Sequence, residues 1–128
     1  MLDAFQKARV SYIFGNFGSD HTVVIEGLAR AKVNGINMPQ AIICPHEIVA
    51  LSAAHGYSLV TGEAQVVMVH CDVGTQNLGG AVHNASRARI PVLIFAGETP
   101  FTLGGELPGT RNRTVNFHQD IFDLIFAL

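Results

Sequence analysis

Residues 41–70 read AIICPHEIVALSAAHGYSLVTGEAQVVMVH and predict a helix between two strands. The runs AIIC (41–44) and VVMVH (66–70) are continuously apolar, which is typical of strands covered on both faces of a parallel sheet. The stretch 45–61 predicts a helix, since Pro45 is tolerated in a first turn and Gly62 suits a left-handed position at a helix end. Strand, helix and strand in this order predict one unit of a parallel α/β sheet.

Glu47 is the only carboxylate of this helix, and residues 46–61 contain no lysine, arginine or aspartate. On helical spacing Glu47 shares a face with Ala50, Leu51 and Ala54, so its side chain is predicted to point towards packed protein. Burying an ionised carboxylate is costly unless it is paired or hydrogen-bonded. A carboxylate near a helix N-terminus also gains up to about 1 kcal/mol from the helix dipole, so both simple capping and a functional role would explain Glu47.

The alternation of strand and helix continues on both sides of this unit. Two more apolar runs predict strands at 12–15 and 91–97, and helices are predicted at 20–34 and 75–87. Ser19 or Asp20 is expected to cap the first of these helices, Thr75 the second, and Gly35 suits a left-handed position after the first. The predicted fold class is α/β, a three-layer α/β/α domain with a mostly parallel sheet.

The C-terminal part of the chain has a different pattern. Residues 98–116 are rich in turn-forming residues and show no periodicity, whereas residues 117–128 predict one amphipathic helix. With 128 residues the chain is expected to form a single domain, 1–128.

The composition restricts the partners. Hydrophobic residues make up 48% and charged residues 14%, which predicts that apolar surface meets another chain or domain. The net charge is −2 and the basic residues are scattered, so nucleic acid is not expected as a partner. No stretch has the length of a membrane span and no signal peptide is recognisable, which predicts no membrane partner and a cytoplasmic protein, with an organelle left open.

The two cysteines, Cys44 and Cys71, fall near predicted strand ends. We interpret both as reduced, buried thiols. A metal site with the neighbouring His46 and His70 is the alternative, but these spacings match no zinc template, so no metal ligand is predicted.

The loops after the predicted strands hold the candidate functional residues, because ligands of such folds bind outside the carboxyl ends of the strands. The loop HCDVGTQNLGG (70–80) could receive an anion, or could be a tight turn that needs glycine; it lacks the spacing of dinucleotide and phosphate-binding loops. His70 could be a general acid or base, or structural. Ser19 could be a helix cap or a nucleophile.

Four segments in order resemble a known family: YIFGNFGSDH, CPHEIVALSAAHGYSLVTG, VGTQNLGGAVHNASRARIPVLIFAGETP and GELPGTRN. Together they resemble the pyrimidine-binding (PYR) domain of thiamine diphosphate enzymes, in the group of acetolactate synthase and benzoylformate decarboxylase. The likeness runs from about residue 12 to residue 120.

The resemblance implies roles for particular residues. Glu47 would be the glutamate that hydrogen-bonds N1′ of the aminopyrimidine ring and so promotes formation of the nucleophilic ylid on the thiazolium. FGNFGS looks like the family's FGNPGS, which would place Asn16, Gly18 and Ser19 on the substrate side, although Phe17 stands where proline is usual.

Two further parts of the site follow from the same resemblance. His70 would match a strand-end histidine that serves acid/base steps in benzoylformate decarboxylase-like members. Gly74, Thr75 and Asn77 would belong to the glycine-rich turn that contacts the cofactor. The implied cofactor is thiamine diphosphate, of which this chain would hold the pyrimidine half.

The chain also departs from the family, because it contains no GDG motif of the PP domain that holds Mg²⁺ and the diphosphate. We therefore expect an incomplete PYR domain that lacks its last strand, with Mg²⁺ bound only through a PP domain and with no catalysis by the isolated chain. Three interpretations stay open: part of a 2-oxo acid decarboxylase or carboligase, one chain of a split enzyme, or a non-catalytic module that pairs with a related enzyme. The expected partner is a second copy or a PP-domain chain, and the substrate of the complete enzyme a small 2-oxo acid.

Overall fold

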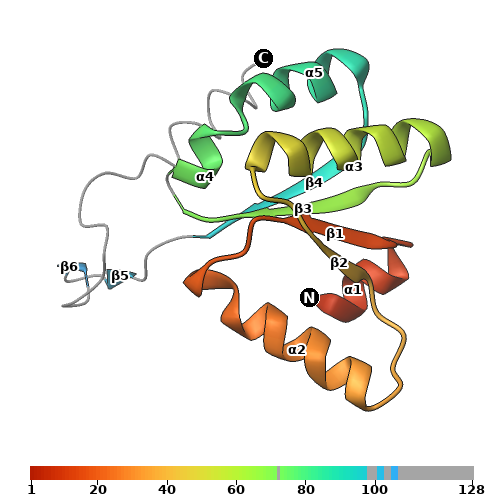
Figure 1. Ribbon diagram of the computed structural model, residues 1–128, viewed down its shortest axis with the longest axis vertical. Coiled ribbons are helices and arrows are strands. Elements are labelled where there is room, and N and C mark those ends of the chain that lie inside the picture. Colours follow the sequence, from red (N-terminus) through yellow and green to blue (C-terminus); the bar gives the residue numbers. More distant parts are fainter. Residues whose placement is uncertain (72, 98–100, 103–104, 107–128) are drawn as a thin grey trace.

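A four-stranded parallel sheet forms the centre of the computed structural model, with the strand order β2-β1-β3-β4 (Figure 1). The structure describes residues 1–71 and 73–97, together with the backbone of 101–102 and 105–106. The strands are β1 (Tyr12–Gly15), β2 (Gln40–Ile43), β3 (Gln65–Val69) and β4 (Val92–Ala96). All four predicted strands are confirmed, and the sheet is parallel in each pair.

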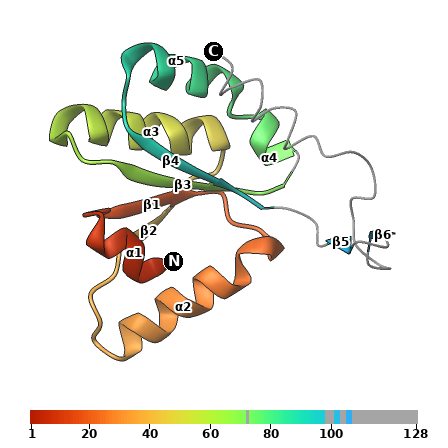
Figure 2. The ribbon, with the colours of Figure 1, turned by 180° about the vertical axis from the view of Figure 1, so that it is seen from behind.

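Helices cover both faces of this sheet, as Figures 1 and 2 show from opposite sides. They are α1 (Leu2–Lys7), α2 (Thr22–Val33), α3 (Glu47–Thr61), α4 (Val73–Gln76) and α5 (Gly79–Ala88), with a 3₁₀ turn η1 (Ser19–His21) before α2. α3 and α5 lie on one face, and α1 and α2 on the other. The predicted three-layer α/β/α class is confirmed. No helix among the described residues is both long and apolar enough to cross a bilayer.

Each face of the sheet has its own apolar core. The central strand β3 is buried along its whole length, because its side chains contribute alternately to both cores. Under α3 and α5 lie Phe14, Leu51, Val67 and Leu78 among others. Under α1 and α2 the core is built on Phe5, Val10, Ile13, Val66 and Met68. The continuous apolar runs of β1 and β3 thus correspond to strands that are covered on both faces, whereas the run in the edge strand β2 is mostly exposed.

The buried face of α3 is the one that its spacing predicted. Glu47, Ala50, Leu51 and Ala54 are all buried, and α3 ends at Gly62, whose φ of 75° is left-handed. Gly35, after α2, also has a positive φ, of 67°. Both glycine predictions are confirmed.

The predicted helix caps were wrong in two places. α2 begins at Thr22, after η1, so neither Ser19 nor Asp20 caps it, and the Asp20 carboxylate instead lies against His70. The predicted helix at 75–87 is two helices, with Thr75 buried inside α4 rather than at a cap. The break comes just before two glycines, Gly79 and Gly80, which are weak helix formers.

Other parts of the prediction have different outcomes. The sequence analysis did not predict α1. In the turn-rich segment, β5 (Phe101–Thr102) and β6 (Gly105–Glu106) form a short antiparallel pair. The helix predicted at 117–128 lies outside the described residues.

Gln65, at the start of β3, is fully buried and hydrogen-bonded at both ends of its amide. Its Oε1 accepts from the backbone N–H groups of Ser11, at 3.2 Å, and Tyr12, at 2.9 Å. Its Nε2 donates to the carbonyl oxygens of Glu63 and Ala64. A polar side chain in the core therefore connects the start of β1 to the start of β3, at the edge of the sheet opposite the candidate site.

Candidate active site at the carboxyl edge of the sheet

Glu47 lies where β1, α3 and α4 meet, and its side chain is buried, with 5% of the residue exposed. Its Oε1 accepts a hydrogen bond from Asn16 Nδ2 at 2.9 Å, and its Oε2 accepts one from Asn77 Nδ2 at 3.0 Å. The two amides come from the loop after β1 and from the residue after α4. The buried carboxylate is therefore met by two neutral donors from distant parts of the chain.

These contacts set the charge of Glu47. Burial raises the pKa of the carboxyl group, but the hydrogen bonds from Asn77 and Asn16, the helix-start backbone N–H and the nearby His46 together outweigh burial, so the pKa lies below its ordinary value. His46 Nδ1 is 3.9 Å from Oε2 and accepts from the Ile48 N–H as the N-cap of α3. Glu47 is consequently ionised at neutral pH. Each oxygen keeps acceptor capacity, because a carboxylate offers about four lone-pair directions.

The turn containing Gly74, Thr75 and Asn77 lies beside Glu47, as the resemblance implied. A Cβ placed on Gly74 would lie 3.4 Å from Glu47 Oε1, so a larger side chain would press on the carboxylate. Thr75 is buried within α4. Of the three, Asn77 contacts Glu47 directly.

The FGNFGS loop divides into two parts. Asn16 turns to Glu47, whereas Phe17 folds back against Gly15 and the core under α2, with its ring 5.5 Å from that of His21. Gly18 donates its N–H to His21 Nδ1 at 3.0 Å.

Ser19, the remaining predicted residue of this loop, begins η1 and is exposed. Its carbonyl oxygen accepts from Thr22 Oγ1. The structure thus brings Asn16 to Glu47 but leaves Ser19 on the surface of the loop.

His70, directly after β3, is paired with a residue that the sequence analysis treated only as a helix cap. Its Nδ1 lies 2.7 Å from Asp20 Oδ1, and its ring lies against Gly18. Asp20 Oδ1 also lies 3.1 Å from His21 Nδ1, and the Asp20 carboxylate occupies the space where Gly97 would carry a side chain. Asp20, His70 and Gly97 follow three different strands, so no rule of sequence spacing predicts that they meet. Only the position of all three loops after parallel strands indicated it.

Three hollows lined by described residues lie away from Glu47. One of about 510 Å³ is lined by residues such as Gln6, Arg9, Asn37 and Glu63, and two others lie along α2. None of these three includes Glu47 or His70. The strand-end position, the buried ionised carboxylate and its fixed amides are therefore better indicators of a site than hollow size.

A parallel α/β sheet with a hydrogen-bonded carboxylate at its carboxyl edge defines a ligand-binding domain of the open α/β type. Residues 1–124 match the family model described as thiamine pyrophosphate enzyme, N-terminal TPP binding domain. The chain belongs to this family of thiamine pyrophosphate (thiamine diphosphate) enzymes.

Several relatives are similar over most of the chain. IlvX of Mycobacterium tuberculosis, described as an acetolactate synthase large subunit, is 31% identical over 98 residues, which are 77% of this chain and 18% of IlvX. The thiamine diphosphate-dependent 4-hydroxybenzoylformate decarboxylase of Rhodococcus jostii RHA1 is 31% identical, with a TM-score of 0.67 over 77% of this chain and 17% of the decarboxylase. The likeness to benzoylformate decarboxylase of Polynucleobacter necessarius, at 23% identity and a TM-score of 0.62 over 76% of this chain and 17% of that one, concerns the fold alone. The chain thus spans less than a fifth of the length of these relatives.

Proposed function

We propose that this chain is the pyrimidine-binding part of a thiamine diphosphate-dependent enzyme that decarboxylates or joins 2-oxo acids, and that Glu47 is its cofactor-activating residue. The observation that carries the proposal is a buried carboxylate whose two oxygens are fixed by Asn16 and Asn77. Support comes from the family and from relatives described as a decarboxylase and a synthase of this cofactor class. When bound, the cofactor would supply the carbanion chemistry of the reaction, and Glu47 would hold its aminopyrimidine ring.

Glu47 fits the aminopyrimidine ring through its charge state and its free acceptor capacity. Because the carboxylate is ionised, it can accept a hydrogen bond from a protonated ring nitrogen, and burial strengthens that bond. The two asparagines keep the carboxylate in one orientation, so little ordering is needed when the ring binds. Gly74 adds no side chain next to Oε1.

His70 is proposed as an acid/base residue on the substrate side. It is partly exposed, with 39% of its side chain accessible, at the same edge of the sheet as Glu47. Asp20 is a positioning residue in this proposal, because its carboxylate lies 2.7 Å from Nδ1 and can form an ion pair with the protonated ring. Asn16 and Gly18 lie on the loop after β1, which the substrate would pass, and an added Cβ on Gly18 would be 3.1 Å from the His70 ring.

The proposed partner is a second copy of the chain or a chain with a PP domain, joined through the outer face of α3. This face consists of Ile48, Val49, Leu59 and Val60, with the small residues Ser52 and Gly56 between them, and all six are exposed. Leu59 is 64% and Val60 86% exposed, and an apolar stripe of this kind on a helix typically marks an interaction surface. Glu47 begins the same helix on its buried face.

Cofactor binding tests the assigned contact directly. Calorimetry would compare thiamine diphosphate with an analogue in which ring nitrogen N1′ is replaced by carbon, in the complete protein with Mg²⁺. We expect the parent protein to bind the true cofactor at least about tenfold more tightly, and Glu47→Gln to lose most of this preference. Glu26→Gln, on the exposed face of α2, is the matched control and should retain the preference. An equal preference in the Glu47 variant would overturn the assignment.

A further inference from the structure

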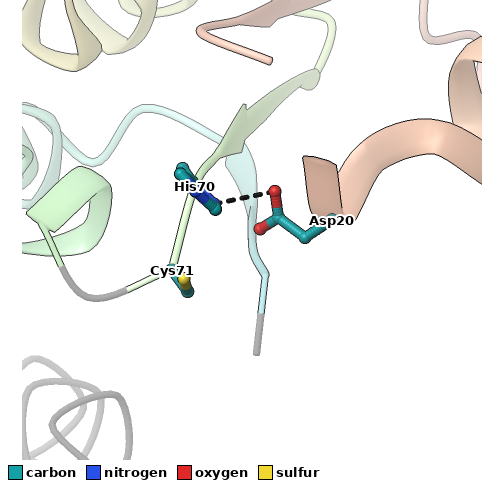
Figure 3. A group of neighbouring side chains, drawn as sticks. All are labelled: Asp20, His70 and Cys71. Atoms are coloured by element: carbon teal, nitrogen blue, oxygen red, sulfur yellow. Dashed lines mark ion pairs between the residues drawn. The ribbon is translucent and has the colours of Figure 1, made fainter. Parts of the chain in front are cut away.

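Asp20, His70 and Cys71 form a compact group of three different donor atoms (Figure 3). Asp20 comes from η1, whereas His70 and Cys71 follow β3 directly. One carboxylate oxygen, one ring nitrogen and the sulfur all lie within 4.8 Å of one another. None of the three residues hydrogen-bonds Glu47 in the described part of the chain, and the cofactor assignment gives Cys71 no role.

The ring nitrogen of His70 that faces Asp20 is buried. His70 Nδ1 is buried and makes no hydrogen bond, although Asp20 Oδ1 is only 2.7 Å away, because the two groups lack hydrogen-bond alignment. The contact of the ring with Gly18 restricts rotation away from Asp20. This buried nitrogen lies beside a carboxylate and a thiol, and all three groups can ligate a cation.

The types of the three donor atoms indicate which cation would bind. Oxygen, imidazole nitrogen and thiolate sulfur together are typical of Zn²⁺, whereas Mg²⁺ and Ca²⁺ prefer oxygen ligands. Zinc bonds of about 2.0–2.3 Å place tetrahedral ligand atoms roughly 3.3–3.8 Å apart, so small side-chain rotations would bring the three atoms into range. Three protein ligands leave a fourth position open, as in zinc sites that bind water or a small molecule.

We propose that Asp20, His70 and Cys71 bind one Zn²⁺ ion at the carboxyl edge of the sheet. The metal would occupy His70 and compete with its proposed acid/base role, so zinc would inhibit the enzyme; this consequence alone rests on the proposed function.

Cobalt tests the site without relying on activity. Titration of the complete protein with Co²⁺ should give a thiolate-to-metal charge-transfer band that saturates at one equivalent and disappears when Zn²⁺ is added. Cys71→Ser should remove the band, and Asp20→Asn and His70→Ala should each weaken binding by at least about tenfold. Cys44→Ser is the matched control, because Cys44 is a thiol buried under α3, and it should retain the band.

A second measurement needs no variant. Zn²⁺ should slow alkylation of Cys71 in the parent protein, as located by mass spectrometry. Absence of the band together with unchanged alkylation, or a band that survives in Cys71→Ser, would overturn the site. Unchanged affinity in Asp20→Asn would remove Asp20 from the ligand set. A spectroscopically confirmed site without inhibition would contradict only the role given to His70.

Discussion

Asn77 donates a hydrogen bond to Glu47 across 3.0 Å, although 30 residues separate them in the sequence. Asn16 makes the corresponding bond from the other direction, 31 residues before Glu47. The charge of the carboxylate is therefore determined by tertiary structure, and the dipole of α3 is only one contribution. This arrangement makes the amides, and not only the glutamate, targets for experiment.

Replacing either asparagine should make protein stability depend differently on pH. The pKa of Glu47 is lowered on folding, so its ionised form stabilises the protein above the unfolded pKa of about 4.3, and this contribution is lost as the pH falls through the folded pKa. We expect Asn77→Leu or Asn16→Leu to reduce the free energy of unfolding by about 1.5–3 kcal/mol at pH 7, and by less as the pH approaches about 3. Urea unfolding at several pH values measures this difference. Asn84→Leu, at an exposed position, is the control, and a pH-independent loss in the site variants would contradict the argument.

Glu47→Gln should abolish turnover in the complete enzyme, with a loss of at least about 100-fold in kcat. The amide has nearly the same shape, but it cannot take up a proton from the ring nitrogen. Steady-state assays with a panel of 2-oxo acids and saturating cofactor would measure it, with Glu26→Gln as the control. Turnover within a few-fold of the parent would exclude Glu47 as the activating residue.

Gly97→Ala should destabilise the protein because the new methyl group would meet the Asp20 carboxylate. We expect the free energy of unfolding to fall by about 1–3 kcal/mol, and by less in the Asp20→Ala background, where the space is free. Gly56→Ala is the contrasting control: it lies inside α3 with nothing within 4 Å of the added carbon, so stability should rise by about 0.5–1 kcal/mol. Thermal unfolding of the parent, the two single variants at positions 97 and 20 and the double variant completes the cycle. An equal penalty with and without Asp20 would contradict the contact.

Gln65→Leu should be the most destabilising polar replacement proposed here. The substitution removes an amide that accepts from two backbone N–H groups and donates to two carbonyl oxygens near the starts of β1 and β3. We therefore expect the free energy of unfolding, measured by chemical unfolding, to fall by about 2–5 kcal/mol. Gln40→Leu provides the matched control, because Gln40 is exposed in the edge strand β2. A loss no larger than that of the control would show that water replaces these bonds.

Val60→Glu should weaken subunit association without unfolding the chain. Val60 is 86% exposed on α3, and a charge there would have to be desolvated when a partner docks. Analytical ultracentrifugation should show a shift towards smaller species. Val23→Glu, on α2 and 85% exposed, should leave the mass unchanged. Equal behaviour of both variants would place the partner surface elsewhere.

Much of the fold could be predicted because its signals are local. The apolar runs that became β1 to β4, and the spacing that buries Glu47 with Leu51, need only the periods of strands and helices. Capping was predicted less well: Asp20 has the chemistry of a cap, but a tertiary contact with His70 determines its place. Burial of Glu47 was predicted from its face of the helix, whereas the identity of its partners depended on how two loops fold.

The two hydrogen bonds to Glu47 are supported by elements of unequal stability, because one of them depends on the four-residue helix α4. Asn16 extends from the end of a central strand, but Asn77 follows a helix of about one turn, which cannot be stable by itself. Local opening of α4 would therefore release Oε2 of Glu47 while Oε1 stays held. Hydrogen exchange should be faster for the amides of α4 than for those of β1, and the carboxylate would then have one permanent anchor and one that can be exchanged for a ligand.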